Sequence, residues 1–253
     1  MKKYIFTYAL LSGIFLSVNA QIVNIESARM QSDTVGWQGG FGMGMSLTQN
    51  TTKIFGMEAE TLLQYKTTND RGLWLFLGNY NLLKIGNTAS ISNYYLHFRY
   101  NRKINEWLRW EFFSQYQNND IMQIDSRVLL GTGPRFKLIK HKYFRLYAGS
   151  LFMFERETEK TNPVVRQKDL RNSSYISFTW LPNPNVEMIS TTYWQPKLKK
   201  LSDYRILNQL VFRVKASPHF AMSMKWNYLH DRFPAGVAPR SPYSFSTGID
   251  YDF

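Results

Sequence analysis

Apolar and polar residues alternate along most of the chain, and the last eleven residues show this pattern clearly. Within residues 243–253 (YSFSTGIDYDF), aromatic and aliphatic side chains fall on one face, and serine, glycine and aspartate fall mainly on the other. Alternation with a period of two predicts a β-strand with one apolar face. Because roughly nine to eleven tilted residues cross the hydrocarbon layer as a strand, this stretch is long enough to span an outer membrane.

The same alternation recurs from Trp37 onward and predicts twelve strands. The stretch 73–83 is apolar on both faces, so its register stays open. An even number of strands lets both chain ends lie on one side of a membrane. We therefore expect an all-β fold, a closed antiparallel transmembrane β-barrel of about twelve strands in an up-and-down meander. The predicted strands are residues 37–48, 54–65, 73–83, 90–100, 108–117, 127–138, 144–155, 171–181, 186–194, 203–215, 219–229 and 243–253.

The predicted connections differ in length. Those after even strands are short, and most of those after odd strands are longer, with 156–170 and 230–242 the longest. Outer-membrane barrels have short periplasmic turns and longer external loops, so this pattern favours periplasmic termini. Pro134 falls on the outward face of its strand, where it cannot donate to the hydrogen-bond ladder. We expect a bulge or a strand end there.

The first twenty residues have the features of a secretory signal. Lys2 and Lys3 give a charged start, an apolar run follows, and small residues ending at Ala20 form a cleavage site. An uncleaved anchoring helix is the alternative, although about fifteen apolar residues are short for a span. We expect residence in the outer membrane of a Gram-negative bacterium. The predicted segments are a signal peptide (1–20), a short periplasmic N-terminal segment (21–36) and the barrel (37–253).

Charge and composition narrow the classes of partner. The net charge is +13, and removal of Lys2 and Lys3 with the signal leaves +13 − 2 = +11. The basic residues are spread along the chain without a recognition motif, so we expect lipid phosphates and not nucleic acid as partners. The chain has no cysteine, which excludes a lipoprotein anchor and disulfides. A mean hydropathy of −0.36 is compatible with a barrel, because inward polar residues offset outward apolar ones.

Charged residues recur on the predicted inward faces. Opposite charges on one inner wall usually pair, because an unpaired charge in a narrow interior is costly. We expect ion-pair networks that fill and rigidify the barrel; a charged, slightly anion-favouring passage is the alternative. The spacing of Glu58 and Glu60, repeated by Asp250 and Asp252, would also suit a cation or a basic ligand. The predicted interior charge network comprises Glu58, Glu60, Arg99, Arg109, Glu111, Arg127, Arg135, Lys137, Arg145, Arg205, Arg213, Lys225, Asp250 and Asp252.

None of the four histidines has metal-ligand or nucleophile–base spacing. We predict no catalytic residue, cofactor or metal. His97 should face the interior, and His230 lies beside Asp231 at a strand end. A lipid hydrolase on the barrel wall would need a serine within hydrogen-bond reach of an oriented histidine, and the sequence shows no such pair. That activity stays open as an alternative, as does a barrel that binds lipid or lipopolysaccharide.

Two predicted outer loops are basic, and aromatic residues lie near strand ends. Lysine and arginine in residues 156–170 and 195–201 (QPKLKKL) would either bind lipopolysaccharide phosphates or be solvated. The aromatic residues fit the girdles of a membrane interface. A soluble periplasmic lipid-binding β-protein is disfavoured, because the predicted inward face is too charged for a lipid pocket. The girdle residues are Trp37, Tyr65, Tyr100, Trp180, Trp194 and Tyr228.

Several motifs together resemble the DUF481 family, whose members are described as salt-induced outer-membrane proteins of the YdiY type. The resemblance implies a barrel of about twelve strands in a Gram-negative outer membrane and brings no established activity. By resemblance to such barrels, Tyr251 and terminal Phe253 form the end read by the barrel-assembly machinery. A structural or envelope-associated component, or a small pore, is the expected function. The motifs are GFGMGMSLTQN (40–50), GTGPRFKL (131–138), SDYR (202–205), PAG (234–236) and STGIDYDF (246–253).

Overall fold

The computed structural model describes residues 35–49, 53–69, 71–86, 89–217 and 220–251, which form twelve β-strands. The predicted signal peptide lies outside these residues. No helix in the described part of the chain is long and apolar enough to cross a membrane. The strands are β1 (Gly36–Gln49), β2 (Lys53–Lys66), β3 (Gly72–Ile85), β4 (Ala89–Lys103), β5 (Leu108–Asn119), β6 (Ile124–Lys140), β7 (Phe144–Glu159), β8 (Arg166–Asn183), β9 (Val186–Lys197), β10 (Lys200–Lys215), β11 (Phe220–Asp231) and β12 (Tyr243–Tyr251).

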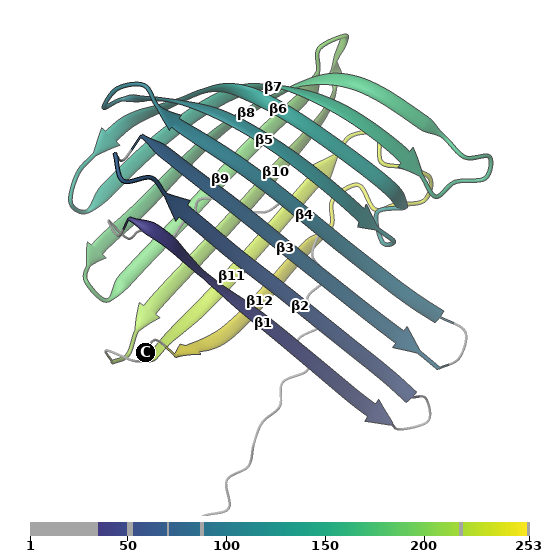
Figure 1. Cartoon of the computed structure of the whole chain (residues 1–253). Helices are drawn as coiled ribbons and strands as arrows, with labels where there is room; N and C mark the ends of the chain where they lie inside the picture. Colours follow the sequence, from purple (N-terminus) through teal and green to yellow (C-terminus); the bar gives the residue numbers. More distant parts are fainter. Residues whose placement is uncertain (1–34, 50–52, 70, 87–88, 218–219, 252–253) are drawn as a thin grey trace, which may run out of the picture.

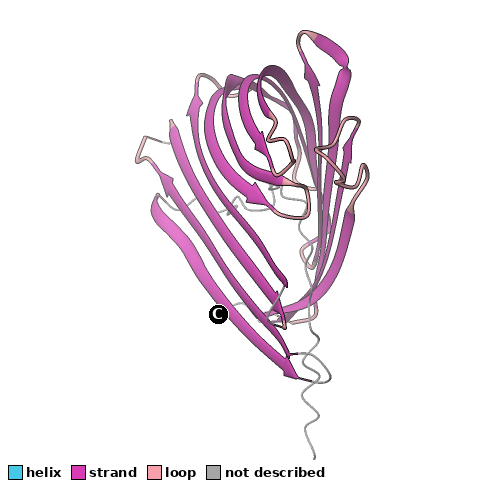
Figure 2. Cartoon of the chain, turned by 90° about the vertical axis from the view of Figure 1, so that its right-hand side faces the viewer, coloured by secondary structure: helices cyan, strands magenta, loops and turns pink. Residues whose placement is uncertain are grey.

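Each strand pairs antiparallel with the next, in the order β1 to β12. The sheet curls so that its two faces become an inside and an outside (Figure 1; Figure 2). The prediction of an all-β, up-and-down barrel of twelve antiparallel strands is confirmed. We call the end at which β1 begins and β12 ends the terminal end, and the opposite end the loop end.

The two faces have the polarity expected of a membrane wall. In β7, Leu151, Met153 and Glu155 are buried inside, whereas Phe152 and Phe154 point outward. Phe152 is 65% exposed and Leu151 only 1% exposed. Exposed aromatic rings beside buried carboxylates are the reverse of a soluble fold, and they are stable where hydrocarbon surrounds the wall.

The structure settles the register of β3, which the sequence left open. Leu75 and Leu77 are buried inside, where they cluster with Tyr95. Trp74 points outward, and its ring stacks on that of Tyr100 with centroids 4.1 Å apart. Both faces of β3 are apolar because one contacts this interior cluster and the other faces the membrane.

The predicted difference in loop length is wrong for most of the barrel. The predicted loop 156–170 is reduced to residues 160–165, because β7 and β8 continue to pair up to Thr158 and Arg166. The predicted loop 195–201 is reduced to the turn 198–199. Near the loop end both faces of these strands carry polar side chains. The apolar alternation therefore stops although the backbone ladder continues.

Pro134 neither ends β6 nor shifts its register, contrary to prediction. It lies opposite Trp110 of β5. The β6–β7 register is the same on both sides of it, as the pairs Thr132–Phe152 and Arg135–Gly149 show. The β6–β7 ladder has no pairs at residues 133 and 134 and resumes in the same register, so loss of the proline donor interrupts the ladder without shifting it. The irregularity nearest to it lies at residues 137–139.

An apolar cluster fills part of the interior between β5 and β11, and the connection 232–242 closes over it. Met122, Ile124, Leu129 and Leu207 are buried in this cluster. Ala238 of the connection packs into the same cluster. The longest connection of the described chain therefore packs against this part of the interior, near the loop end.

Candidate functional site

Buried charged side chains form two clusters inside the barrel. They come from successive strands whose alternation turns one side chain in two inward. The loop-end cluster comprises Arg127 of β6, Glu155 and Glu157 of β7, Asp169 and Arg171 of β8, Lys197 of β9, Asp203 and Arg205 of β10, and Asp231 of β11. The terminal-side cluster comprises Arg99 of β4, Glu111 of β5 and Arg135 of β6.

Arg205 lies at the centre of the loop-end cluster and contacts three carboxylates. Its Nη1 lies 2.6 Å from Oε2 of Glu155, its Nη2 lies 3.2 Å from Oε2 of Glu157, and its Nε lies 2.7 Å from Oδ2 of Asp231. Arg205 itself is only 5% exposed. Charge-assisted bonds of this kind, with every partner also buried, hold β7, β10 and β11 at fixed positions.

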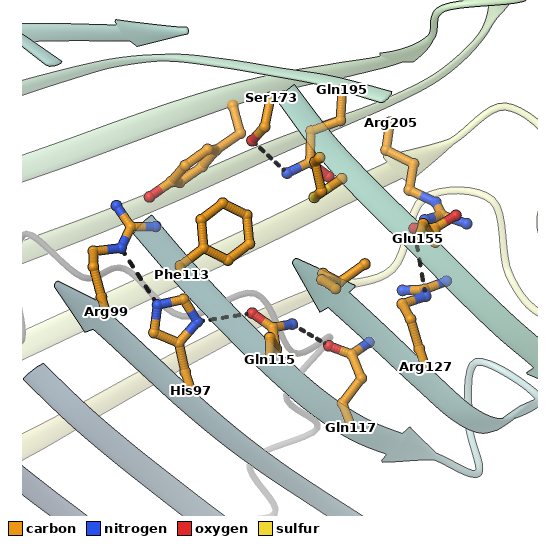
Figure 3. Close-up of a pocket in the computed structure, with 13 residues that line it drawn as sticks. His97, Arg99, Phe113, Gln115, Gln117, Arg127, Glu155, Ser173, Gln195 and Arg205 are labelled. Carbon is orange, nitrogen blue, oxygen red and sulfur yellow. Dashed lines mark hydrogen bonds and ion pairs between the residues drawn. The ribbon is translucent and has the colours of Figure 1, made fainter. Parts of the chain in front are cut away.

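The same two glutamates bind further arginines. Nε of Arg127 lies 2.6 Å from Oε2 of Glu157, and Nε of Arg171 lies 3.1 Å from Oε1 of Glu155. Arg171 also reaches Oδ1 of Asp203 at 3.3 Å. Figure 3 shows Arg127 and Arg205 converging on Glu155. The loop-end cluster is thus one connected network.

Lys197 completes this network at its rim. Its Nζ lies 2.9 Å from Oδ2 of Asp169 and 3.0 Å from Oδ2 of Asp203. Four cations therefore face five carboxylates in the loop-end cluster, so the charges nearly cancel. Because most of these charges have an opposite partner, the attraction between partners offsets the free-energy penalty of removing them from water.

Glu111 is the centre of the smaller terminal-side cluster and is fully buried. Its Oε2 lies 3.0 Å from Nη1 of Arg99 and accepts a hydrogen bond from the Tyr175 hydroxyl at 2.8 Å. Its Oε1 lies 3.6 Å from Nη1 of Arg135. The Arg135 guanidinium also lies over the Tyr147 ring, 4.1 Å from its centroid. Glu111 thus contacts both arginines, and the Tyr147 ring contacts one of them.

A series of hydrogen-bonded polar side chains starts at Arg99 of the terminal-side cluster and runs toward the loop end (Figure 3). Nε of Arg99 donates to Nε2 of His97 at 3.4 Å. Because that ring nitrogen accepts, Nδ1 carries the proton and donates to Oε1 of Gln115, 3.0 Å away. Gln115 in turn donates to Gln117. His97 is therefore a neutral, fully bonded residue of the interior.

The cavity beside this series of side chains is small. It measures about 30 Å³ and lies between His97, Phe113, Met153 and Arg205 (Figure 3). Since one water needs roughly 10–15 Å³ measured in this way, the cavity has room for about two waters. It is too small for an organic solute.

The structure brings together five of the sequence-predicted residues inside the two clusters, namely Arg99, Glu111, Arg127, Arg135 and Arg205. Four others lie less deeply buried near the terminal end of their strands, namely Arg109, Lys137, Arg145 and Arg213.

The remaining predicted residues lie apart from both clusters. Glu58 is half-buried in β2, while Glu60 and, in β11, Lys225 are exposed. Asp250 and Tyr251 stand opposite Ala221 and Phe220 in the β11–β12 register. Their side chains, with residues 252–253, lie outside the part of the chain that is described.

Sequence reasoning missed several members of the loop-end cluster. The predicted interior charge network did not include Glu155, Glu157, Asp203 and Asp231, which are buried inside. All four fall at or beyond the predicted strand ends. The signal was present in β7, where Glu155, Glu157 and Glu159 continue the inward spacing of two. Arg171 was missed for the same reason, at the start of its predicted strand.

The outer wall holds a serine–histidine pair that the sequence did not reveal. His230 Nδ1 and the Ser241 hydroxyl lie 2.9 Å apart, where the connection 232–242 extends the β11–β12 hairpin. Asp231 points to the other face and binds Arg205. Among the described residues, no carboxylate makes an ion pair with His230. The pair therefore has a nucleophile and a base but lacks the acid that usually orients the base.

The chain is similar to one described protein family and to solved barrel structures. Residues 41–253 match the family described as "Protein of unknown function, DUF481". The NanC porin structure has 10% sequence identity and a TM-score of 0.50, covering 85% of this chain and 99% of that one. The translocator domain of the autotransporter NalP from Neisseria meningitidis has 9% identity and a TM-score of 0.48, covering 86% of each chain. No curated protein matches the chain.

Proposed function

Because the chain belongs to the DUF481 family and folds as an outer-membrane-type barrel, we propose that it is an integral outer-membrane protein of a Gram-negative bacterium. Its signal peptide, residues 1–20, is cleaved on export. Both termini then lie in the periplasm, and the loop end faces outward. Membrane lipid, including lipopolysaccharide, surrounds the wall, and the barrel-assembly machinery inserts the chain.

Within that membrane the protein acts as a structural or envelope-associated component with a filled interior. The observation that carries this proposal is the loop-end cluster, in which buried ion pairs link β6, β7, β8, β10 and β11 across the inside. The 232–242 connection packs over the same half of the barrel. A wide passage would require these charges to separate, which would leave each of them unpaired.

The space beside β1 is the one part of the described interior where a small pore has structural support. Side chains are absent at Gly40 and Gly44, and a Cβ atom at either position would meet nothing within 4 Å. A passage there would be lined by Glu58, Glu60 and Lys225. The small-pore alternative therefore predicts a conductance that depends on these three residues.

Planar bilayers separate the two alternatives. We expect purified, folded protein to leave the membrane silent, because the filled half blocks the interior. Folding is verified first by faster migration of the unheated sample on a gel. Steady single-protein conductance would contradict the filled barrel. A change of that conductance in Glu60→Gln, but not in the outer-turn variant Lys199→Gln, would establish the small pore.

A lipid hydrolase is the second candidate, favoured by the Ser241–His230 contact on the outer wall. We expect any hydrolysis of phospholipid by the purified protein to be lost in Ser241→Ala and in His230→Gln, because one removes the nucleophile and the other the base. Ser202→Ala, an exposed serine of β10, is the matched control. Absence of turnover by folded wild-type protein would eliminate this candidate.

A further inference from the structure

The outer wall carries an apolar groove that runs across β4 to β8. It has a volume of about 550 Å³, and a size of this order suits a chain-like apolar ligand. Its floor is low because Ser114, Gly131 and Thr132 are small. Its sides are formed by the larger outward residues Phe98, Phe112, Leu130, Phe152, Phe154 and Leu170. We call it the wall groove.

A cationic pair lies directly beyond the groove, toward the loop end. Phe154 and Leu170 stand opposite each other in the β7–β8 ladder, and the next outward pair is Arg156 and Lys168. Arg166 is the outward residue that follows on β8. All three cations are exposed. Along both strands, the outward face therefore changes from apolar to strongly basic between one outward residue and the next.

Two like charges in one cross-strand pair repel each other. Among the described residues, no carboxylate oxygen lies within 4.0 Å of Arg156, Arg166 or Lys168. The basic residues of the loop-end cluster differ in this respect: Lys197, for example, contacts two carboxylates. An anion that lies between Arg156 and Lys168 would relieve the repulsion and form charge-assisted hydrogen bonds.

We propose that the wall groove and the Arg156–Lys168 pair together bind one phosphorylated, acylated lipid. An acyl chain lies in the groove, and a headgroup phosphate lies between the two cations, with Arg166 available to a second phosphate. This inference rests on the proposed orientation of the barrel. With the loop end outside, the cations stand at the outer leaflet, so the occupant is lipopolysaccharide, bound through the phosphates of its acylated anchor.

The charge and the groove must both contribute if the site recognises an amphiphile. If lipid were held only by general attraction to a basic surface, removal of any exposed cation at this end would weaken binding equally. The turn between β9 and β10 provides the comparison, because Lys199 and Lys200 are exposed at the same end of the barrel. Lys200 lies over the Phe233 ring, 4.6 Å from its centroid. Leu198 of the same turn donates to the Leu170 carbonyl, but neither lysine lines the groove.

Native mass spectrometry of the full chain in detergent tests the proposal. The probes are the lipid A portion of lipopolysaccharide, phosphatidylglycerol, phosphatidylcholine and inorganic phosphate. We expect lipid A to bind most tightly, phosphatidylcholine and inorganic phosphate at least tenfold more weakly, and phosphatidylglycerol in between, because only lipid A offers acyl chains and more than one phosphate.

Three variants locate the binding. Arg156→Gln with Lys168→Gln should weaken lipid A binding by roughly tenfold or more, and Lys199→Gln with Lys200→Gln should change it less than about twofold. Ser114→Trp, which fills the groove and leaves the charge unchanged, should also weaken binding. Equal losses in both double variants, or no effect of Ser114→Trp, would overturn the site.

Two further results distinguish this site from the proposed function. Stronger binding of phosphatidylglycerol than of lipid A by the same residues would overturn the lipopolysaccharide assignment and the outward loop end. A heat-dependent gel shift reports the folded barrel independently. Folded protein that binds no lipid would therefore refute the lipid site and leave the membrane assignment standing.

Discussion

At the scale of single residues, Arg205 shows how charge is accommodated inside this barrel. Its guanidinium is buried and shared among Glu155, Glu157 and Asp231. Each of these carboxylates lies on a neighbouring or more distant strand, and each would lose a close cation if Arg205 were removed. Arg205 contributes to the stability of the folded barrel mainly because, without it, these buried carboxylates would lack a close cation.

Arg205→Ala should therefore destabilise the folded barrel by roughly 3–5 kcal/mol, the usual effect of breaking a buried ion pair. Urea unfolding in lipid vesicles measures the loss. Lys225→Ala removes an exposed cation from the adjacent strand and should cost less than about 1 kcal/mol. Similar losses for the two variants would show that the loop-end cluster does not hold the wall together.

At the scale of elements, β7 and β8 extend beyond the apolar band and carry charged side chains at their ends. Their paired tips place Glu155 and Glu157 inside and Arg156 and Lys168 outside. A loop in this region could not present two opposite faces in register. The continuous ladder is thus a precondition for both the loop-end cluster and the proposed lipid site.

Hydrogen exchange tests this extension directly. Amides of residues 156–159 and 166–170 should exchange slowly, because their strands are hydrogen bonded in the ladder. The connecting residues 161–164 should exchange fast. Mass spectrometry of peptides from this region measures both rates. Uniformly fast exchange throughout 156–170 would support the long loop expected from sequence and contradict the ladder.

At the scale of the whole molecule, the barrel is filled unevenly. Large charged and aromatic side chains occupy the inside of β4 to β11, whereas β1 presents glycines on its inward face. The outward face is apolar along many of the strands, from Trp37 to Phe245. The filled side supports a structural role, and the outward face requires a surrounding membrane.

Assembly into that membrane gives a prediction for the chain end, which lies outside the described residues. Deletion of Phe253 should lower the amount of folded barrel in the membrane, because the terminal aromatic residue is proposed to be read by the assembly machinery. Phe245→Ala removes an outward aromatic residue from the same strand without altering the terminus. Quantifying the heat-modifiable band in membranes measures both, and equal folded levels after the deletion would refute this role.

The sequence alone determined the alternation, the twelve strands and the inward direction of Arg99, Glu111, Arg127, Arg135 and Arg205, because a period of two is a local property of an extended backbone. It did not determine where β7 to β10 end, since apolar contrast disappears when both faces are polar. The sequence also did not determine which side chains contact these charges. The Tyr175 hydroxyl, for example, donates to Glu111 across a separation of 64 residues. Such contacts depend on the curvature of the sheet, which only the tertiary structure decided.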